Sequence, residues 1–151
     1  MNVKICNLRE TTVSGVKAVY SDSYETHRDH YIEWTPFPIS SEFQTGRVMA
    51  GLLQAWHHAP VFPWVERHED NEMFYFVEGT GLMLFMDYVD EKPVLETAQV
   101  VRIPEGVTLE IAKGKGHCVA VAQGDTYKVI VISPEQDAPK TQLTEEVCGV
   151  E

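Results

Sequence analysis

Apolar and polar positions follow a short, strand-like rhythm over the middle of the chain. From residue 47 to residue 133, apolar runs recur at a spacing of roughly 8–12 residues and end at turn-forming residues. No long window carries the 3.6-residue period of an amphipathic helix. The runs predict strands over residues 47–56, 60–68, 72–79, 81–88, 98–106, 107–114, 117–123 and 126–133. Many short strands separated by turns indicate an all-β sandwich or barrel.

Three parts of this region carry more specific predictions. The first run, RVMAGLLQAW, is almost wholly apolar and is expected to be a buried strand. Pro60 and Pro63 confine the next strand to a sheet edge or an irregular start, because proline has no N–H group for the ladder. The runs over 72–79 and 81–88 are expected to form a hairpin through a turn at Gly79-Thr80-Gly81.

A polar and aromatic segment precedes the strand-rich region. Pro36 and Pro38 exclude regular helix near them. We therefore expect a long loop or arm that is packed by its own aromatic residues Tyr31, Trp34 and Phe37.

The length of 151 residues suits one domain with a proper core. We expect residues 1–46 to hold N-terminal strands and the arm, with one or two strands in VKICNL and GVKAVY. Residues 47–133 are expected to form the core of the barrel. The acidic residues 134–151 are expected to be a tail or a short helix.

Charge and composition narrow the possible partners. The 23 acidic and 12 basic residues give a net charge of −11, which argues against binding nucleic acid or anionic lipid. No apolar run reaches the roughly 18 residues of a membrane span. The first ten residues lack an apolar signal segment, so a cytoplasmic location is expected. The three cysteines, Cys6, Cys118 and Cys148, lack metal-type spacing and are expected to be reduced thiols.

The densest group of chemically active residues lies between Glu66 and Glu72. In a strand, Glu66 and His68 point to the same face because side chains alternate, and Glu72 joins them after a bend. Imidazole and carboxylate groups suit Zn, Mn, Fe, Ni or Co, and the same groups can transfer protons. The group therefore fits a metal site or an acid–base pair. The alternative is a surface strand on which Arg67 and Glu69 simply form salt bridges.

Four further residues each fit two roles. His117 starts a later strand and fits either a fourth member of this group or a structural histidine. Arg102 lies in the apolar strand VVRIP, where a buried guanidinium must be paired or bind an anionic ligand. His57 and His58 precede a proline turn and fit either the border of a pocket or a plain turn. Neither a glycine-rich phosphate loop nor a nucleophile elbow occurs in the sequence.

The spacing of the acidic and histidine group resembles the first motif of the cupin family of small β-barrels. That motif has two histidines one residue apart, then a glutamate, then a glycine. Glu66 stands in the place of the first histidine. His68, Glu72 and Gly79 are in register with the other positions.

A second cupin motif is also matched in part. It consists of Pro-x-Gly followed by a histidine. The chain has Pro104-Glu105-Gly106, with Leu109 at the position of the histidine. The two motifs together imply a cupin-type jelly-roll β-barrel.

Within the cupins, the chain resembles the ureidoglycolate lyase family over roughly residues 47–132. The resemblance lies in the triplet Glu66-Arg67-His68 after a proline-containing strand, the aromatic strand around Phe74, and the later histidine His117. It implies cleavage of ureidoglycolate to glyoxylate and urea, a reaction of purine catabolism. That reaction needs a base, an acid and a cation for the substrate carboxylate.

The resemblance also suggests roles for individual residues. His68 would be the base, oriented by Glu66, and His117 would be the acid. Arg102 would bind the substrate carboxylate, with Glu72 also contacting substrate. If a divalent metal is bound, Glu66, His68, Glu72 and His117 would be its ligands and the metal would polarise the substrate hydroxyl.

Two alternatives of other classes stay open. The first is a metal-dependent cupin isomerase or oxygenase that acts on a small polar metabolite. The second is a non-catalytic cupin that binds a small molecule, which the replacement of the motif histidine by Leu109 favours. A homodimer is expected in each case, because twofold pairing is the commonest form of oligomer.

Overall fold

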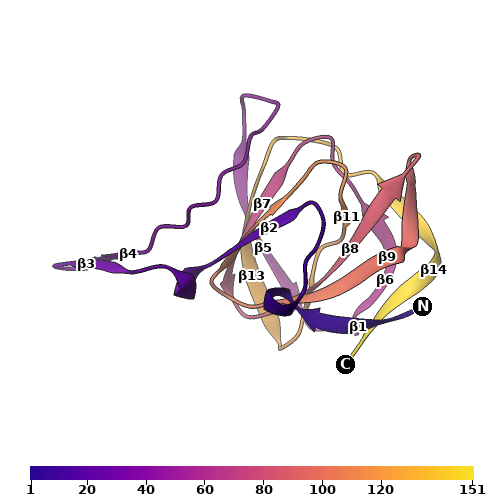
Figure 1. Ribbon diagram of the computed structural model, residues 1–151, viewed down its shortest axis with the longest axis horizontal. Coiled ribbons are helices and arrows are strands. Elements are labelled where there is room, and N and C mark those ends of the chain that lie inside the picture. The colour runs from indigo at the N-terminus through magenta and orange to yellow at the C-terminus, as the bar shows by residue number, and fades with distance from the viewer.

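The computed structural model describes residues 1–151 and consists almost entirely of β-strands joined by short turns (Figure 1). The strands are β1 (Asn2–Asn7), β2 (Val16–Tyr20), β3 (His27–Asp29), β4 (Ile32–Trp34), β5 (Met49–Trp56), β6 (Val61–Glu66), β7 (Glu72–Glu78), β8 (Gly81–Val89), β9 (Lys92–Ile103), β10 (Val107–Ile111), β11 (Gly116–His117), β12 (Val121–Ala122), β13 (Thr126–Ser133) and β14 (Lys140–Val150). The helical elements are two 3₁₀ turns, η1 (Leu8–Glu10) and η2 (Ser21–Ser23). The predicted all-β fold is confirmed. None of the helices is long and apolar enough to span a membrane.

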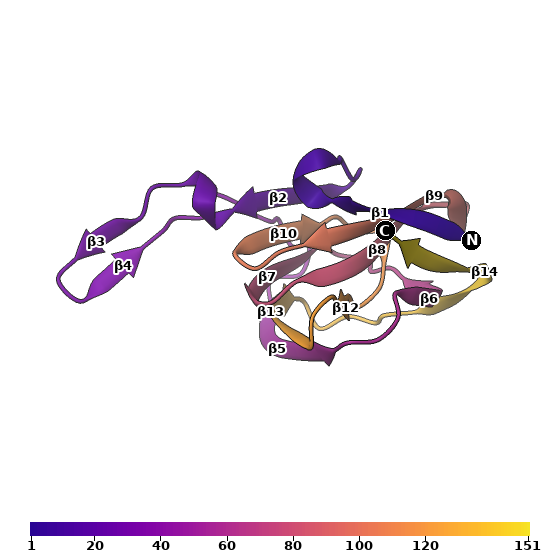
Figure 2. The same cartoon turned by 90° about the horizontal axis from the view of Figure 1, so that it is seen from below.

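Two large sheets build the body of the protein. A seven-stranded sheet has the order β11-β6-β14-β1-β9-β8-β12, and an additional pairing of β11 with β8 closes its first six strands into a ring. A five-stranded sheet has the order β2-β10-β7-β13-β5, and Figure 2 shows these strands following one another down one side of the body. The closed ring and the packed second sheet together form a barrel.

The apolar run of β8 is buried on both faces, and it separates two cores. Met83 and Phe85 face an inter-sheet core, between the two sheets. Leu84 and Met86 face a ring core, enclosed by the strands of the first sheet. A strand buried on both faces must be apolar at successive positions, which explains the unbroken run in the sequence.

The predicted hairpin between β7 and β8 is wrong, because the two strands belong to different sheets. β7 pairs with β10 and β13, whereas β8 pairs with β9. The turn at Gly79 carries the chain from one sheet to the other. A glycine turn between two apolar runs gives the same sequence pattern whether the second strand pairs with the first or crosses to another sheet.

The prediction that the first apolar run is buried is also wrong. β5 forms the edge of the five-stranded sheet and pairs with β13 along its whole length. Leu52 and Trp56, which share its outward face, are exposed, and Met49 at its start is exposed as well. The proline-containing strand β6 does not lie at an edge, since it pairs with β11 and β14, but its ladder with β14 is interrupted at Pro63: Phe62 and Trp64 are two residues apart, whereas their partners on β14 are five apart.

The N-terminal arm projects from the body as a small hairpin of β3 and β4 (Figures 1 and 2). Phe37 packs against Tyr75 of β7, with ring centroids 5.5 Å apart. Tyr31 and Trp34 do not pack the arm as expected, because both are exposed and Tyr31 is 95% exposed. The arm therefore returns to the body through Phe37.

The C-terminal segment is neither a tail nor a helix, since residues 140–150 form strand β14 of the ring. Leu143 and Val147 are buried in the ring core, and the residues between them lie at the irregular pairing with β6. The expectation of a tail or helix rested on the acidic composition of the segment, but the acidic residues Glu145 and Glu146 are exposed on β14 while Leu143 and Val147 face the core.

We expect Gly79→Ala to destabilise the protein by about 2 kcal/mol. Gly79 has φ +75°, and an added Cβ would lie 2.5 Å from the carbonyl oxygen of Thr126. Gly114→Ala is the matched control, since Gly114 has φ +78° with no atom within 4 Å of the added Cβ. Urea unfolding measures both variants. Equal losses of stability would show that the contact with Thr126 has no cost.

Candidate functional site

Three strand ends bring the predicted residues together at one end of the inter-sheet core. Glu66 is the last residue of β6 and pairs in register with His117 of β11. Glu72 is the first residue of β7, and His68 lies in the short connection between β6 and β7. The imidazole rings of His68 and His117 lie with centroids 5.2 Å apart, and Phe74 contacts the ring of His117 edge-on.

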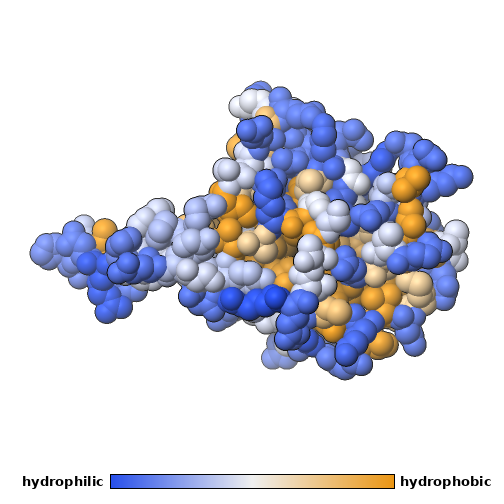
Figure 3. All heavy atoms as spheres, viewed as in Figure 1, coloured by the Kyte–Doolittle hydropathy of each residue, from blue (hydrophilic) through white to orange (hydrophobic).

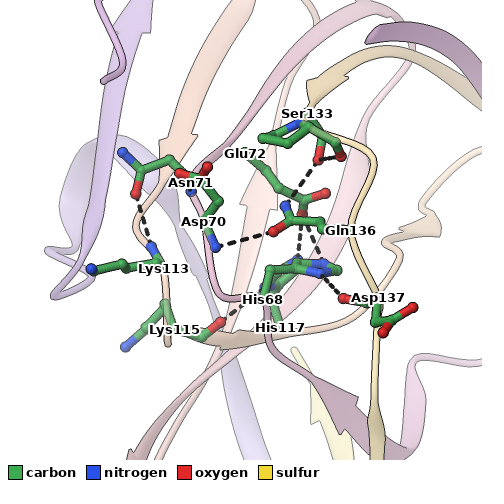
Figure 4. A network of polar contacts seen from close by, with 11 residues as sticks. His68, Asp70, Asn71, Glu72, Lys113, Lys115, His117, Ser133, Gln136 and Asp137 are labelled. Atoms are coloured by element: carbon green, nitrogen blue, oxygen red, sulfur yellow. Dashed lines mark hydrogen bonds and ion pairs between the residues drawn. The ribbon is translucent and has the colours of Figure 1, made fainter. Parts of the chain in front are cut away.

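The hydrogen bonds of both histidines fix which nitrogen faces the site. Nδ1 of His68 donates to the carbonyl oxygen of Asp137 at 3.0 Å, and Nδ1 of His117 donates to the carbonyl oxygen of Lys115 at 3.0 Å. A carbonyl oxygen can only accept, so each Nδ1 carries a proton. In the neutral ring each Nε2 therefore presents a lone pair, and both Nε2 atoms point toward Glu72 (Figure 4).

One carboxylate oxygen meets both of these nitrogens. Oε2 of Glu72 lies 3.1 Å from Nε2 of His68 and 3.0 Å from Nε2 of His117. Two lone pairs directed at an anionic oxygen repel unless a positive charge lies among them. That charge is supplied either by protons on the imidazoles or by a metal cation.

Without a metal, the contacts shift two pKa values in opposite directions. Burial raises the pKa of Glu72, but hydrogen bonds from His117 and His68 outweigh it and lower the pKa to about 2. Burial lowers the pKa of His68, but its hydrogen bond and charge interaction with Glu72 outweigh burial and raise it. The metal-free site therefore holds an anionic carboxylate against a histidine that protonates more readily than usual.

The donor atoms also fit a divalent metal. One ligand atom from each of Glu66, His68 and His117 lies within 4.8 Å of the others, and Glu72 adds a second carboxylate. A ligating histidine usually donates its other ring N–H to a carbonyl or carboxylate, as both histidines do here. Imidazole and carboxylate ligands suit Zn, Mn, Fe, Ni or Co. The structure brings these four residues together.

The connection that contains His68 is held in place by two residues, Asp70 and Asn71. Neither of them was identified from the sequence. The Asp70 carboxylate accepts hydrogen bonds from the backbone N–H groups of Gln44, Thr45 and Asn71. Burial raises the pKa of Asp70, but these N–H groups outweigh it and lower the pKa overall. The Asn71 side chain bonds Ser41 and accepts from Lys113 N–H. Adjacent Asp and Asn residues are typical of turns, and this signal in the sequence would have pointed to Asp70 and Asn71 as the residues that hold the connection.

A second missed segment covers the site. The connection between β13 and β14 supplies the carbonyl of Asp137 that holds His68. Gln136 in the same connection accepts from Asp70 N–H and donates to Ser133 Oγ. Figure 4 shows this segment lying beside the two histidines. His117 is only 2% exposed and His68 is 7% exposed, so both rings are shielded from solvent.

Arg102 does not join the group. Its guanidinium donates to Glu151 at 2.7 Å, to Asn7 at 2.8 Å and to Gln123 at 3.0 Å. Its neighbour Ile103 faces the inter-sheet core, where the ring of His117 meets Phe74, so Arg102 points to the other side of β9. Its charge is satisfied within the chain.

The remaining candidates lie outside the group. His57 and His58 border a hollow of about 560 Å³ with mainly apolar lining, next to the end of β5. Arg67 forms a salt bridge, as the surface alternative proposed, but its partner is Glu91 of the β8–β9 turn. Arg67 can therefore form a salt bridge at the surface while its neighbours Glu66 and His68 belong to the buried group.

We expect the thiol of Cys118 to resist alkylation in the folded protein. Burial raises the pKa of Cys118, and the thiol donates to the carbonyl oxygen of Trp64 at 2.7 Å. Cys6 is an exposed free cysteine and is the internal control. Mass spectrometry after iodoacetamide treatment at neutral pH should find Cys6 modified and Cys118 modified only in urea. Modification of Cys118 in the native protein would contradict the buried placement.

Comparisons with known proteins identify the fold. No family model matches the chain, and no curated protein matches it. RmlC from Streptococcus suis, solved in complex with dTDP-D-xylose, has a TM-score of 0.51 and 10% identity over 80% of this chain and 64% of its own. Oxalate decarboxylase OxdC from Bacillus subtilis has a TM-score of 0.44 and 14% identity over 64% of this chain and 24% of its own. An 11S globulin from Wrightia tinctoria, described with an auxin-binding site, has a TM-score of 0.46 and 12% identity over 64% of this chain and 22% of its own.

The likeness to RmlC shows that the chain has a cupin-type jelly-roll fold, as the sequence resemblance implied. The chain spans 64% of the RmlC chain and about a quarter of the decarboxylase and globulin chains. At this level of identity the likeness establishes the fold alone, and function must be argued from the site.

Proposed function

We propose that this chain is a divalent-metal-binding cupin enzyme that acts on a small polar metabolite. The observation that supports the proposal most strongly is the convergence of two Nδ1-protonated histidines on one oxygen of Glu72. That arrangement leaves two Nε2 lone pairs and two carboxylates around one position. This donor set suits a divalent transition-metal ion.

Each residue of the group has a distinct task under this proposal. His68 and His117 would bind the ion through Nε2, with Glu66 and Glu72 as carboxylate ligands. The bound ion would act as a Lewis acid and supply positive charge for an anionic substrate. The carbonyl groups of Asp137 and Lys115 hold the two rings in the required tautomer. Phe74 and the buried surroundings exclude water from the reacting position.

Cleavage of ureidoglycolate to glyoxylate and urea is the specific reaction that we propose to test. It rests on the triplet Glu66-Arg67-His68 and on His117, which occurs in the same group of side chains. The placement of Arg102 leaves the substrate carboxylate without the guanidinium partner that the resemblance implies. The proposed ion is the remaining source of positive charge in the group. The cytoplasmic location stays a prediction.

Metal binding is the first test of the proposed function. Metal-free protein is titrated with Mn²⁺, Co²⁺ and Zn²⁺ by calorimetry, and the visible absorption of Co²⁺ reports its ligands. One equivalent that is lost in His68→Ala supports the proposal. Failure of all three ions to bind the wild-type chain would overturn it and favour the non-catalytic small-molecule binder.

Turnover is the second test, performed on protein loaded with the ion that binds. Glyoxylate release from ureidoglycolate that disappears in His68→Ala supports the lyase activity. Release that persists in His68→Ala would contradict the role of this group. A chain that binds one metal ion but releases no glyoxylate would exclude the lyase and leave an isomerase or oxygenase.

A further inference from the structure

We propose that two copies of this chain pair through the open edge of β5, in antiparallel orientation, with Leu52 on the twofold axis. The proposal concerns a surface that contains none of the proposed metal ligands, and it does not depend on the proposed function. It rests on the exposure, the charge and the symmetry of the side chains along β5.

β5 is an edge strand without the usual protection against pairing. Its ladder with β13 runs without a break from Met49 to Trp56, so the strand is regular and free of bulges. It contains no proline and no charged residue. An open edge offers unpaired N–H and C=O groups to another chain. Natural proteins usually prevent such pairing with a lysine, a proline or a bulge in the edge strand. The bare edge of β5 therefore indicates that another strand covers it.

The charge distribution points to the same surface. The whole chain has a net charge of −11 and 23 acidic residues, but residues 43–65 contain none of them and carry one basic residue, Arg47. Two copies with a net charge of −11 repel one another at most surfaces. They can approach closely where acidic residues are absent, and depletion of charge is typical of the core of a protein interface.

The exposed apolar side chains are arranged symmetrically about Leu52. Leu52 is 68% exposed, Trp56 is 64% exposed, and Val48, directly before the strand, is 50% exposed. Val48 and Trp56 each lie four positions from Leu52, and residues an even number apart share one face of a strand. An antiparallel pair centred on Leu52 therefore sets each Val48 opposite the partner copy's Trp56 and the two Leu52 side chains together. Such self-complementarity is what a twofold interface requires.

The hollow beside β5 extends the apolar surface. Trp56 lines this hollow of about 560 Å³ together with Trp64 and Val119. In the proposed pairing, Val48 of the second copy comes to lie opposite Trp56, at the border of the hollow. Contact with this border would bury apolar surface beyond the two strands themselves.

The projecting arm is a weaker candidate for self-association. Figure 3 shows apolar patches on the body, whereas the face of the arm in this view is mainly hydrophilic, although Ile32 and Trp34 of the arm are 52% and 64% exposed. The strands of the arm carry their own salt bridge, between Arg28 and Glu33. Tyr31 at the tip of the arm is nevertheless exposed, so a variant at this position tests the arm directly.

Sedimentation equilibrium of the full chain over a range of concentrations tests the proposal. We expect a dimer for the wild type and at least a 100-fold weaker dissociation constant for Leu52→Lys, because the axis would bring two lysines together. Tyr31→Lys and Val89→Lys introduce the same charge at other exposed apolar positions and should remain dimeric. A monomeric wild type, a Leu52→Lys variant that stays dimeric, or dissociation by Tyr31→Lys would each overturn the proposal.

Disulfide trapping checks the register independently of stability. A cysteine at the axis meets its own copy, so Leu52→Cys treated with diamide should give a covalent dimer on a non-reducing gel. In this register Ala50 faces Gln54 of the second copy, so Ala50→Cys should form little covalent dimer under the same conditions. The wild type shows the background from the exposed Cys6. Equal trapping of Ala50→Cys and Leu52→Cys would overturn the proposed axis.

Discussion

Replacing His117 with alanine is expected to weaken divalent-metal binding by at least about 100-fold. His117 contributes one of the two Nε2 atoms in the group, and its Nδ1 is bound to the carbonyl of Lys115. Its ring is almost wholly buried, so no side chain from the protein surface can take its place as a metal ligand. Calorimetric titration of metal-free protein with the ion that binds the wild type most tightly measures the loss.

His57→Ala is the matched control for this experiment. His57 also donates from Nδ1 to a backbone carbonyl, that of Ala122 at 2.9 Å, but it lies beside the hollow at the end of β5. Its replacement should leave metal affinity within about twofold of the wild type. If His57→Ala and His117→Ala weakened binding equally, the ion would not be held by the Glu66, His68 and His117 group.

The site was easier to predict than the sheets because its spacing is local. Glu66, His68 and Glu72 lie within seven residues, so they can meet even though His68 lies in the connection after β6 and not on the predicted strand. The structure adds the reason that His117 joins them, which is its register with Glu66 between β11 and β6. That register depends on the closed ring and has no signature in the sequence.

The wrong predictions for β5 and for the β7–β8 hairpin share one physical cause. An apolar run shows that a strand exists but does not identify its neighbours or its burial. β8 and β5 are both apolar runs in the sequence, but β8 lies between two cores and β5 lies at an edge. An apolar edge strand looks like a core strand whenever its partner is another chain, which is the interpretation proposed for β5.

Arg102 shows the limit of reasoning from residue type. A guanidinium in an apolar strand must find negative charge or hydrogen-bond acceptors. The sequence could not show that Glu151, at the end of the chain, supplies them. The C-terminal strand β14, which was expected to be a tail or helix, brings Glu151 to this position through its parallel pairing with β1.

Replacing Glu72 with glutamine is expected to destabilise the metal-free protein by about 3 kcal/mol near pH 5.5 and by much less near pH 8. Glu72 is a buried carboxylate in contact with both imidazoles, so its removal leaves their Nε2 atoms without the anion. Urea unfolding in the presence of a chelator at the two pH values measures the difference. Glu78→Gln, which breaks the exposed pair with Lys128, is the control and should cost under about 1 kcal/mol at both.

The direction of this pH dependence follows from the two pKa shifts. The pKa of Glu72 is lowered from 4.5 to about 2, so its contribution to stability is present above pH 4.5 and is lost as the pH falls toward 2. The pKa of His68 is raised above 6.5, so its contribution is complete below pH 6.5 and is lost as the pH rises through the raised value. Both contributions are present together between about pH 4.5 and 6.5, which is where Glu72→Gln should cost most. An equal cost at both pH values would mean that His68 carries no additional proton in contact with Glu72.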